Sequence, residues 1–293
     1  MLAAAAVAIG LWWPVAAPGG AHVAFTKVYS QRMELDVLDV KTGRTVRIGT
    51  SAGQLTPTWS PSGGEVAYAA GGVLYVVSAN GSGKHRYLAP TKSFAPAWRP
   101  GTTQLAYLTT HGSKNTDLWV GAALWARDAI GRPAWSPDGT MLAFQRDDGI
   151  YVATGAGAVQ RVASIANPGE PTWSPDGKRI AYTVGHELRV IAADGSSPPR
   201  RLASNLHDPG PPSWSPSGKL VAVSRAGGVW VANLYGGGYP VDESAHAFGV
   251  GTSWDGADLL ISASAPRCPV RTAIVRIRPS GAATTLTGTC RPA

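Results

Sequence analysis

The chain has 293 residues, among them 36 glycines, 23 prolines and 11 tryptophans, and only 15% of its residues are charged. This composition is typical of a turn-rich, all-β domain and excludes a coiled coil or a long helical bundle. The net charge of +8 comes from scattered arginines and lysines with no basic run between aromatic residues, so we expect no nucleic-acid partner.

The first 17 residues are apolar, and the chain begins MLAAAAVAIGLWWPVAA. They predict the core of a signal peptide or a short membrane anchor, although no basic residue precedes them and they are short for a membrane span. We therefore divide the chain into residues 1–17, a leader or anchor, and residues 18–293, the folded domain. The alternative is that residues 12–17 form the first strand of the domain, which cleavage after Ala17 would remove.

One phrase of about twelve residues recurs along the chain. It reads PTWSPSGGEVAY from Pro57, PAWRPGTTQLAY from Pro96 and PTWSPDGKRIAY from Pro171, with further copies from Pro133 and Pro212 and a degenerate copy, TSWDGADLLI, from Thr252. The spacing of 37 to 41 residues between its tryptophans is typical of β-propeller blades. The tryptophans are Trp59, Trp98, Trp135, Trp173, Trp214 and Trp254.

A further copy precedes these six. When Pro18 is aligned with Pro61, APGGAHVAF falls on SPSGGEVAY without a gap, and Ala16 takes the tryptophan position. The sequence therefore predicts a single β-propeller of seven four-stranded blades, with six blades as the alternative. Seven complete blades would share no strand between the first and the last, so closure would rest on packing between blade faces.

Each copy predicts four strands, A to D. Strand A carries Pro-x-Trp, and proline fits an edge strand because it cannot donate a ladder hydrogen bond. Ser-Pro-Asp/Ser-Gly predicts a type I turn between strands A and B. The tryptophan is a large apolar side chain suited to packing between blades. Trp125 lies in an irregular unit, where packing and an exposed contact are both open.

The repeated Pro-x-Trp-Ser-Pro-Asp-Gly-x-x-aliphatic-Ala-Tyr/Phe phrase resembles the TolB-like β-propeller repeat, over about residues 16–290. The same repeat occurs in propellers attached to prolyl-oligopeptidase-type peptidases. The resemblance implies an exported envelope protein that binds other proteins and is not an enzyme. It does not imply a particular partner, because the motif residues are scaffold.

The two cysteines lie at the ends of the last two predicted strands. Cys268 precedes the last C strand and Cys290 follows the last D strand. Because these strands are antiparallel neighbours, we expect the thiols to lie close and form a disulfide, which persists outside the cytosol. The alternative is two unrelated buried thiols.

The sequence lacks the main catalytic motifs. The Gly-x-Ser-x-Gly nucleophile turn is missing, since GTSWD at 251–255 ends in Asp255. GSGKH at 81–85 lacks the first glycine of a phosphate-binding loop, and no zinc-ligand spacing occurs. We therefore assign no catalytic, cofactor-binding or metal-binding residue.

Polar residues gather in the predicted B–C and D–A loops, which share one face of a propeller. Variable loops on a rigid scaffold carry function, so we take this face as the candidate binding surface. The alternatives are a solvated polar face and an enzyme site, of a lyase or hydrolase, that uses His207, His246 and neighbouring carboxylates at the channel mouth. The candidate residues are His111, Asp147, Asp148, Glu170, His186, His207, Asp208, Asp242, Glu243 and His246.

Together these observations predict a monomeric, exported or membrane-tethered interaction module. We expect a protein partner and no cofactor.

Overall fold

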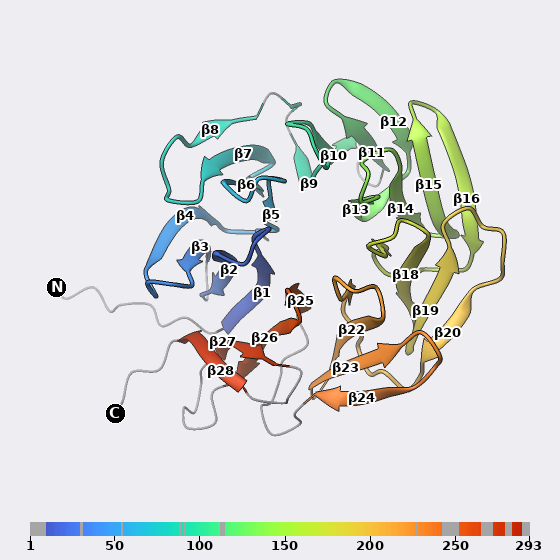
Figure 1. The fold of residues 1–293 in the computed structure, drawn as a ribbon. Helices are drawn as coiled ribbons and strands as arrows, with labels where there is room; N and C mark the ends of the chain where they lie inside the picture. The colour runs from blue at the N-terminus through green and yellow to red at the C-terminus, as the bar shows by residue number, and fades with distance from the viewer. Residues whose placement is uncertain are drawn as a thin grey trace.

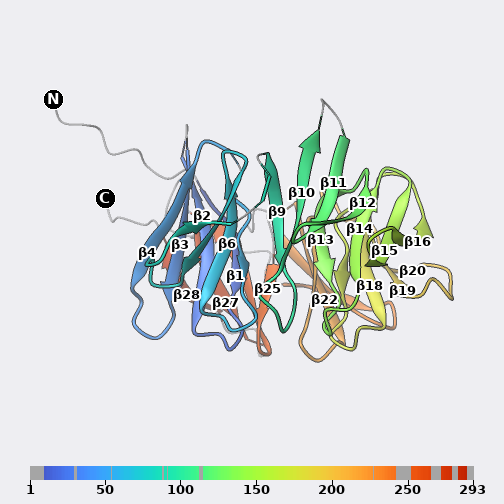
Figure 2. The same cartoon turned by 90° about the horizontal axis from the view of Figure 1, so that it is seen from above.

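The computed structural model describes a ring of seven four-stranded antiparallel sheets around a central channel (Figures 1 and 2). The predicted seven-bladed β-propeller is confirmed. No helix long and apolar enough to cross a membrane is found in the described part of the chain. The described residues are 10–29, 32–53, 55–87, 89–90, 92–111, 115–226, 228–241, 252–264, 272–278 and 283–288.

Each blade uses its strands in chain order from the channel outward, as A, B, C and D. Blade 1 contains β1 (Gly10–Ala16), β2 (His22–Val28), β3 (Met33–Asp39) and β4 (Thr45–Ser51). Blade 2 contains β5 (Thr58–Trp59), β6 (Glu65–Ala70), β7 (Val73–Ser78) and β8 (His85–Arg86). Blade 3 contains β9 (Ser93–Trp98), β10 (Leu105–His111), β11 (Asn115–Val120) and β12 (Ala123–Arg127). Blade 4 contains β13 (Ile130–Trp135), β14 (Leu142–Arg146), β15 (Gly149–Gly155) and β16 (Ala158–Ser164). Blade 5 contains β17 (Thr172–Trp173), β18 (Arg179–Val184), β19 (Glu187–Ala192) and β20 (Arg200–Ala203). Blade 6 contains β21 (Pro212–Trp214), β22 (Leu220–Arg225), β23 (Gly228–Asn233) and β24 (Gly238–Val241). Blade 7 contains β25 (Thr252–Asp255), β26 (Asp258–Ser264), β27 (Thr272–Ile277) and β28 (Ala283–Gly288).

The first strand lies within the segment assigned to a leader or anchor. β1 pairs with β2 as the inner strand of blade 1, and Val15 pairs with Ala24. Pro14 is buried and stands two residues before Ala16, as the motif proline stands before the tryptophan. Residues 10–16 therefore act as strand A of blade 1. Export and anchoring stay predictions.

The Ser-Pro-Asp-Gly turn is held by its own side chains. In blade 5, the Gly177 amide donates to the Ser174 backbone oxygen at 2.9 Å, and Gly177 has a φ of +69°, which glycine adopts without strain. The Ser174 hydroxyl donates to Asp176 at 2.5 Å and accepts from the Arg179 amide at 2.9 Å. These bonds satisfy the buried hydroxyl and start β18 in register.

The motif tryptophans join neighbouring blades through hydrogen bonds as well as packing. Trp59, Trp98, Trp135, Trp173 and Trp214 are at most 9% exposed, and Trp254 is partly buried. The indole N–H of five of them donates to a backbone oxygen on strand A of the preceding blade. The pairs are Trp59 to Val15 at 2.8 Å, Trp135 to Ala97 at 3.2 Å, Trp173 to Ala134 at 2.8 Å, Trp214 to Thr172 at 3.2 Å and Trp254 to Ser213 at 3.0 Å.

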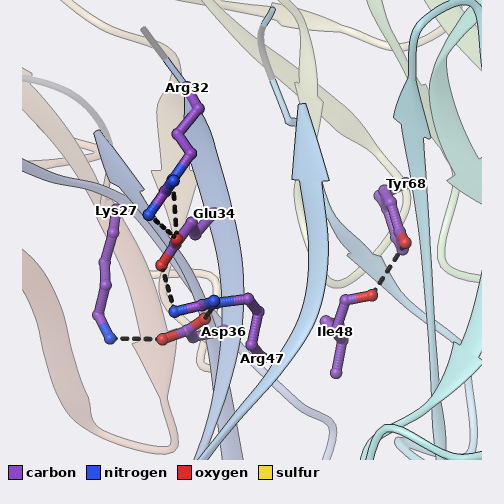
Figure 3. Close-up of polar contacts among 7 residues, drawn as sticks. All are labelled: Lys27, Arg32, Glu34, Asp36, Arg47, Ile48 and Tyr68. Atoms are coloured by element: carbon purple, nitrogen blue, oxygen red, sulfur yellow. Dashed lines mark hydrogen bonds and ion pairs between the residues drawn. The ribbon is translucent and has the colours of Figure 1, made fainter. Parts of the chain in front are cut away.

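The aromatic residue that ends the repeated phrase also packs between blades. These side chains lie on strand B and are at most 1% exposed: Phe25, Tyr68, Tyr107, Phe144 and Tyr182. The Tyr68 hydroxyl donates to the Ile48 backbone oxygen of blade 1 at 2.9 Å (Figure 3). Strand B of each of these blades thus supplies a large buried ring to the core, as burial of apolar area requires.

Blades 1 and 7 close the ring without a shared strand among the described residues, and lie side by side in Figure 1. Phe25 and Val23 pack in one buried cluster with Leu260 and Ile274 of blade 7. The Ala16 amide donates to the Ser253 hydroxyl at 3.2 Å. Closure therefore rests on packing between blade faces, as predicted. Cys268 and Cys290 lie outside the described residues, so the disulfide stays a prediction.

A buried ionic network occupies the outer part of blade 1 (Figure 3). The Asp36 carboxylate, on β3 opposite Phe25, pairs with Lys27 at 2.5 Å. Glu34, whose side chain is only 1% exposed, pairs with Arg47 at 2.7 Å and Arg32 at 3.0 Å. Buried carboxylates need such partners, because an unpaired buried charge is strongly destabilising.

Candidate functional site

The B–C and D–A connections lie at one end of the ring, which we call the loop face; the β10–β11 hairpin rises from it in Figure 2. The A–B and C–D turns form the opposite turn face. Of the predicted residues on the loop face, His111 ends β10, and Asp147, Asp148, Glu170, His186, His207 and Asp208 lie in connections of blades 4 to 6. Asp242, Glu243 and His246 lie outside the described residues.

The central channel holds a cavity of about 350 Å³ lined by the A strands. Four motif prolines line it, as the repeat predicted for an edge strand: Pro96, Pro133, Pro171 and Pro212. Its charged lining residues are Arg132 and Glu170. Each directly precedes a motif proline, so the two occupy the same position in consecutive blades, at the loop-face end of strand A.

Arg132 reaches between blades. Its guanidinium, on β13 of blade 4, donates to the backbone oxygen of Pro57 in blade 2 at 3.2 Å. Burial lowers the pKa of Arg132, and the nearby Glu170 charge raises it. Burial raises the pKa of Glu170, while the charge and backbone N–H of Arg132 lower it. Each group therefore favours the charged form of the other inside the channel.

Both charged side chains remain partly accessible to solvent, because they face the channel cavity while protein surrounds them on the other sides. An arginine presents several fixed N–H donors and stays charged, which suits recognition of carboxylates. The channel mouth can thus receive a charged or hydrogen-bonding group from another molecule.

His186 and His207 meet on the loop face. The centres of their rings are 5.5 Å apart. The His186 Nδ1 lies 2.9 Å from the Leu206 backbone oxygen, next to His207 in the chain. Both side chains are exposed. The predicted pair of His207 and His246 cannot be placed, because His246 is outside the described residues.

Asp148 belongs to a recurrent structural pair. Its carboxylate contacts Arg161 of β16 at 3.1 Å and accepts from the Tyr151 hydroxyl at 3.0 Å. These hydrogen bonds, led by that from Tyr151, lower the pKa of Asp148. Carboxylates near the start of strand C pair with an arginine of strand D in two other blades, Glu34 with Arg47 at 2.7 Å and Glu187 with Arg201 at 3.2 Å. We therefore interpret Asp148 as a residue that holds strands together.

Other chemistry is sparse in the part of the chain that the structure describes. Those residues contain no group of three histidine, cysteine, aspartate or glutamate side chains that could hold a metal ion. A second cavity, of about 640 Å³, opens between blades 4 and 5 on the turn face, and its charged lining residues are Lys178 and Asp194. Trp125 is buried and its ring centre lies 5.4 Å from that of Trp135, so it packs and is not an exposed contact.

Arg132 is a channel residue that the loop pattern does not predict. That pattern includes Glu170 only as a loop carboxylate. The signal lay in the repeat itself, because the residue before the motif proline is Thr56, Ala95, Arg132, Glu170 and Pro211 in blades 2 to 6. Strand A lines the channel, so a charge at this position faces the channel mouth.

These features define a seven-bladed β-propeller with a charged pair at the mouth of its channel. Residues 54–233 match the family described as the TolB beta propeller domain, and the chain belongs to this family. A comparison with curated proteins gives no match.

Solved structures show the same fold. A protein assigned as TolB from Agrobacterium tumefaciens is 15% identical with a TM-score of 0.56, and the match covers 88% of this chain and 89% of that one. A puromycin-hydrolyzing peptidase from Mycobacterium tuberculosis is 14% identical with a TM-score of 0.70, covering 96% of this chain but 54% of that one. An oligogalacturonate lyase in complex with manganese is 15% identical with a TM-score of 0.62, covering 85% and 84%. At these identities the likeness concerns the fold alone.

Proposed function

We propose that this chain is a non-enzymatic TolB-like interaction module whose protein partner docks on the loop face over the channel mouth. The observation that carries the proposal is the Arg132 and Glu170 pair, which lies in a proline-lined cavity of about 350 Å³. A rigid ring that presents variable loops around one charged opening is a suitable docking surface.

The partner is expected to place a polar or acidic group at Arg132. The guanidinium there is held by the Pro57 oxygen and faces Glu170, so its orientation is set before binding. Preorganisation of this kind lowers the entropy lost on association. We propose no nucleic-acid partner and a monomeric module.

The module is proposed to act outside the cytoplasm, either exported or tethered through its N-terminus. β1 constrains how this happens. Because Trp59 donates to the Val15 oxygen and β1 is the inner strand of blade 1, cleavage after Ala17 would remove part of the ring. We therefore propose that the N-terminal segment is retained as a tether or cleaved before Gly10.

The test compares partner recovery by three forms of the chain expressed in its native host and crosslinked reversibly. Arg132→Gln is expected to lower recovery of a specific partner at least tenfold relative to wild type, which corresponds to about 1.4 kcal/mol. Lys178→Gln, on the turn face, is the control and is expected to have no effect. Equal recovery by wild type and Arg132→Gln, or turnover of a peptide or oligosaccharide by the purified chain, would overturn the proposal.

A further inference from the structure

Hydrogen bonds of the backbone hold the segments that carry His186 and His207 on the loop face. The Leu206 amide donates to the His186 backbone oxygen at 2.9 Å, and the Leu206 oxygen lies 2.9 Å from the His186 Nδ1. The Ala226 amide donates to the His207 backbone oxygen at 2.8 Å. Leu206 itself is buried. The β18–β19 turn and the β20–β21 loop are thus fixed to each other where the two imidazoles meet.

The bond to Leu206 also sets the tautomer of His186. A carbonyl oxygen can only accept, so in the neutral ring Nδ1 carries the hydrogen and Nε2 keeps a lone pair. An N–H of a ligating histidine that donates to a backbone oxygen is the usual arrangement around protein-bound metals, because it orients the ring and raises its basicity.

The ring separation fits one shared metal ion. A metal about 2.0–2.1 Å from one nitrogen of each of two imidazoles, at a roughly tetrahedral angle, places the ring centres about 5 to 5.5 Å apart. The observed separation of His186 and His207 is 5.5 Å. Neutral imidazole suits zinc, copper and nickel, whereas magnesium and calcium prefer oxygen ligands.

We propose that His186 and His207 form a two-histidine site for a divalent transition metal on the loop face. Neighbouring Glu187 is held by Arg189 at 2.7 Å and Arg201 at 3.2 Å, so it does not serve as a third ligand. Water molecules complete the coordination sphere. The metal joins the B–C turn of blade 5 to the loop that enters blade 6. This site does not depend on the proposed docking function, because the protein alone binds the ion.

The test is calorimetric titration of the full chain, without a histidine tag, with Zn²⁺ at a pH above the usual histidine pKa. We expect the His186 and His207 site to bind one Zn²⁺ per chain, to bind Cu²⁺ more tightly than Zn²⁺, and not to bind Mg²⁺ or Ca²⁺. His186→Ala and His207→Ala should each weaken Zn²⁺ binding at least tenfold. His85→Ala is the matched control, since His85 is exposed with its Nδ1 3.0 Å from the Gly83 oxygen but is not in a described ring contact with a second histidine.

A second readout separates site loss from damage to the fold. Zn²⁺ should raise the unfolding temperature of wild type and His85→Ala by mass action, and not that of His186→Ala. Equal Zn²⁺ affinity in wild type and in both loop-face variants would overturn the proposal, as would no binding by a folded wild-type chain.

Discussion

The indole N–H of Trp173 donates to the backbone oxygen of Ala134 in the preceding blade, at 2.8 Å. Ala134 directly precedes Trp135, whose own indole donates to Ala97 of the blade before. Each of these two tryptophans therefore donates to the residue that directly precedes the motif tryptophan of the blade before it. The repeated phrase builds the contact between blades as well as the blade itself.

The tryptophan bond should be measurable by comparing two blades. Trp173→Phe removes the bond to Ala134 and part of the buried ring, so we expect it to lower the free energy of unfolding by about 2–4 kcal/mol. Trp98 is buried to a similar degree, but its indole nitrogen has no hydrogen-bond partner among the described residues. Trp98→Phe should therefore be less destabilising by about 1 kcal/mol. Urea unfolding of both variants checks this, and equal losses would contradict it.

Ser174, in the turn of blade 5, should keep the pKa of Asp176 low. Hydrogen bonds from the Ser174 hydroxyl and the Lys178 amide lower the pKa of Asp176 from its usual 3.8. The unfolded chain then binds more protons than the folded one near that pH, so this stabilisation is present above about pH 3.8 and is lost as the pH falls through the folded pKa. Ser174→Ala should raise the pKa of Asp176, as measured by NMR.

The control for that experiment is the equivalent turn of blade 6. Ser215 there bonds to Ser217 at 3.1 Å and accepts from the Leu220 amide at 3.1 Å, with no carboxylate in the turn. Ser215→Ala should lower stability by about 1–2 kcal/mol without changing the acid limb of the unfolding curve. An unchanged Asp176 pKa in Ser174→Ala would refute this account of the turn.

The channel pair should show energetic coupling. Glu170→Gln and Arg132→Met each remove a charge that favours the ionised form of the other group, so we expect a favourable coupling free energy of about 1–3 kcal/mol, below the figure for a fully buried pair because the channel admits water. The double variant should therefore be more stable than the sum of the two single effects predicts. Thermal unfolding of the two single variants and the double variant gives the coupling, and additive effects would contradict it.

Glu170 should make the free energy of unfolding depend on pH with the opposite sign to the dependence from Asp176. Burial raises the pKa of Glu170 above its usual 4.5. The folded chain then holds its proton to higher pH than the unfolded chain, so stability falls as the pH rises from about 4.5 through the folded pKa. Glu170→Gln should remove this part of the slope, and a slope unchanged in that variant would show that another group causes it.

The closure of the ring should resemble its other blade contacts. Phe25 and Phe144 both lie on strand B and are fully buried, Phe25 at the closure and Phe144 between blades 3 and 4. If packing alone closes the ring, Phe25→Ala and Phe144→Ala should each lower stability by about 3–5 kcal/mol. A much smaller effect of Phe25→Ala in an intact, cooperatively unfolding ring would show that another element holds the closure.

Much of this architecture is predictable from the sequence, because each repeat contains the turn and strand residues of its own blade. The Ser-Pro-x-Gly turns and the spacing of the tryptophans define the strands, and the alignment of Pro18 with Pro61 correctly placed Ala16 at the tryptophan position of blade 1. The tryptophan hydrogen bonds were not predicted, because an acceptor about 40 residues away is visible only once the blades are arranged.

The candidate site was less predictable. The role of Arg132 is not predictable from its own loop, because it depends on Pro57 and Glu170 from other blades. The contact of His186 with His207 was not foreseen as a pair, since it depends on how the Leu206 loop folds back onto the β18–β19 turn.

Site-specific photo-crosslinking in the native host tests most directly whether a partner docks on the loop face. A photoreactive residue would replace exposed Asp147, His186 or His207 on the loop face, or exposed Lys178 or Lys219 on the turn face. We expect a discrete protein adduct from the loop-face positions that is lost when Arg132→Gln is added, and none from the turn face. The same adduct from the turn-face positions alone, or from both faces regardless of Arg132, would contradict it.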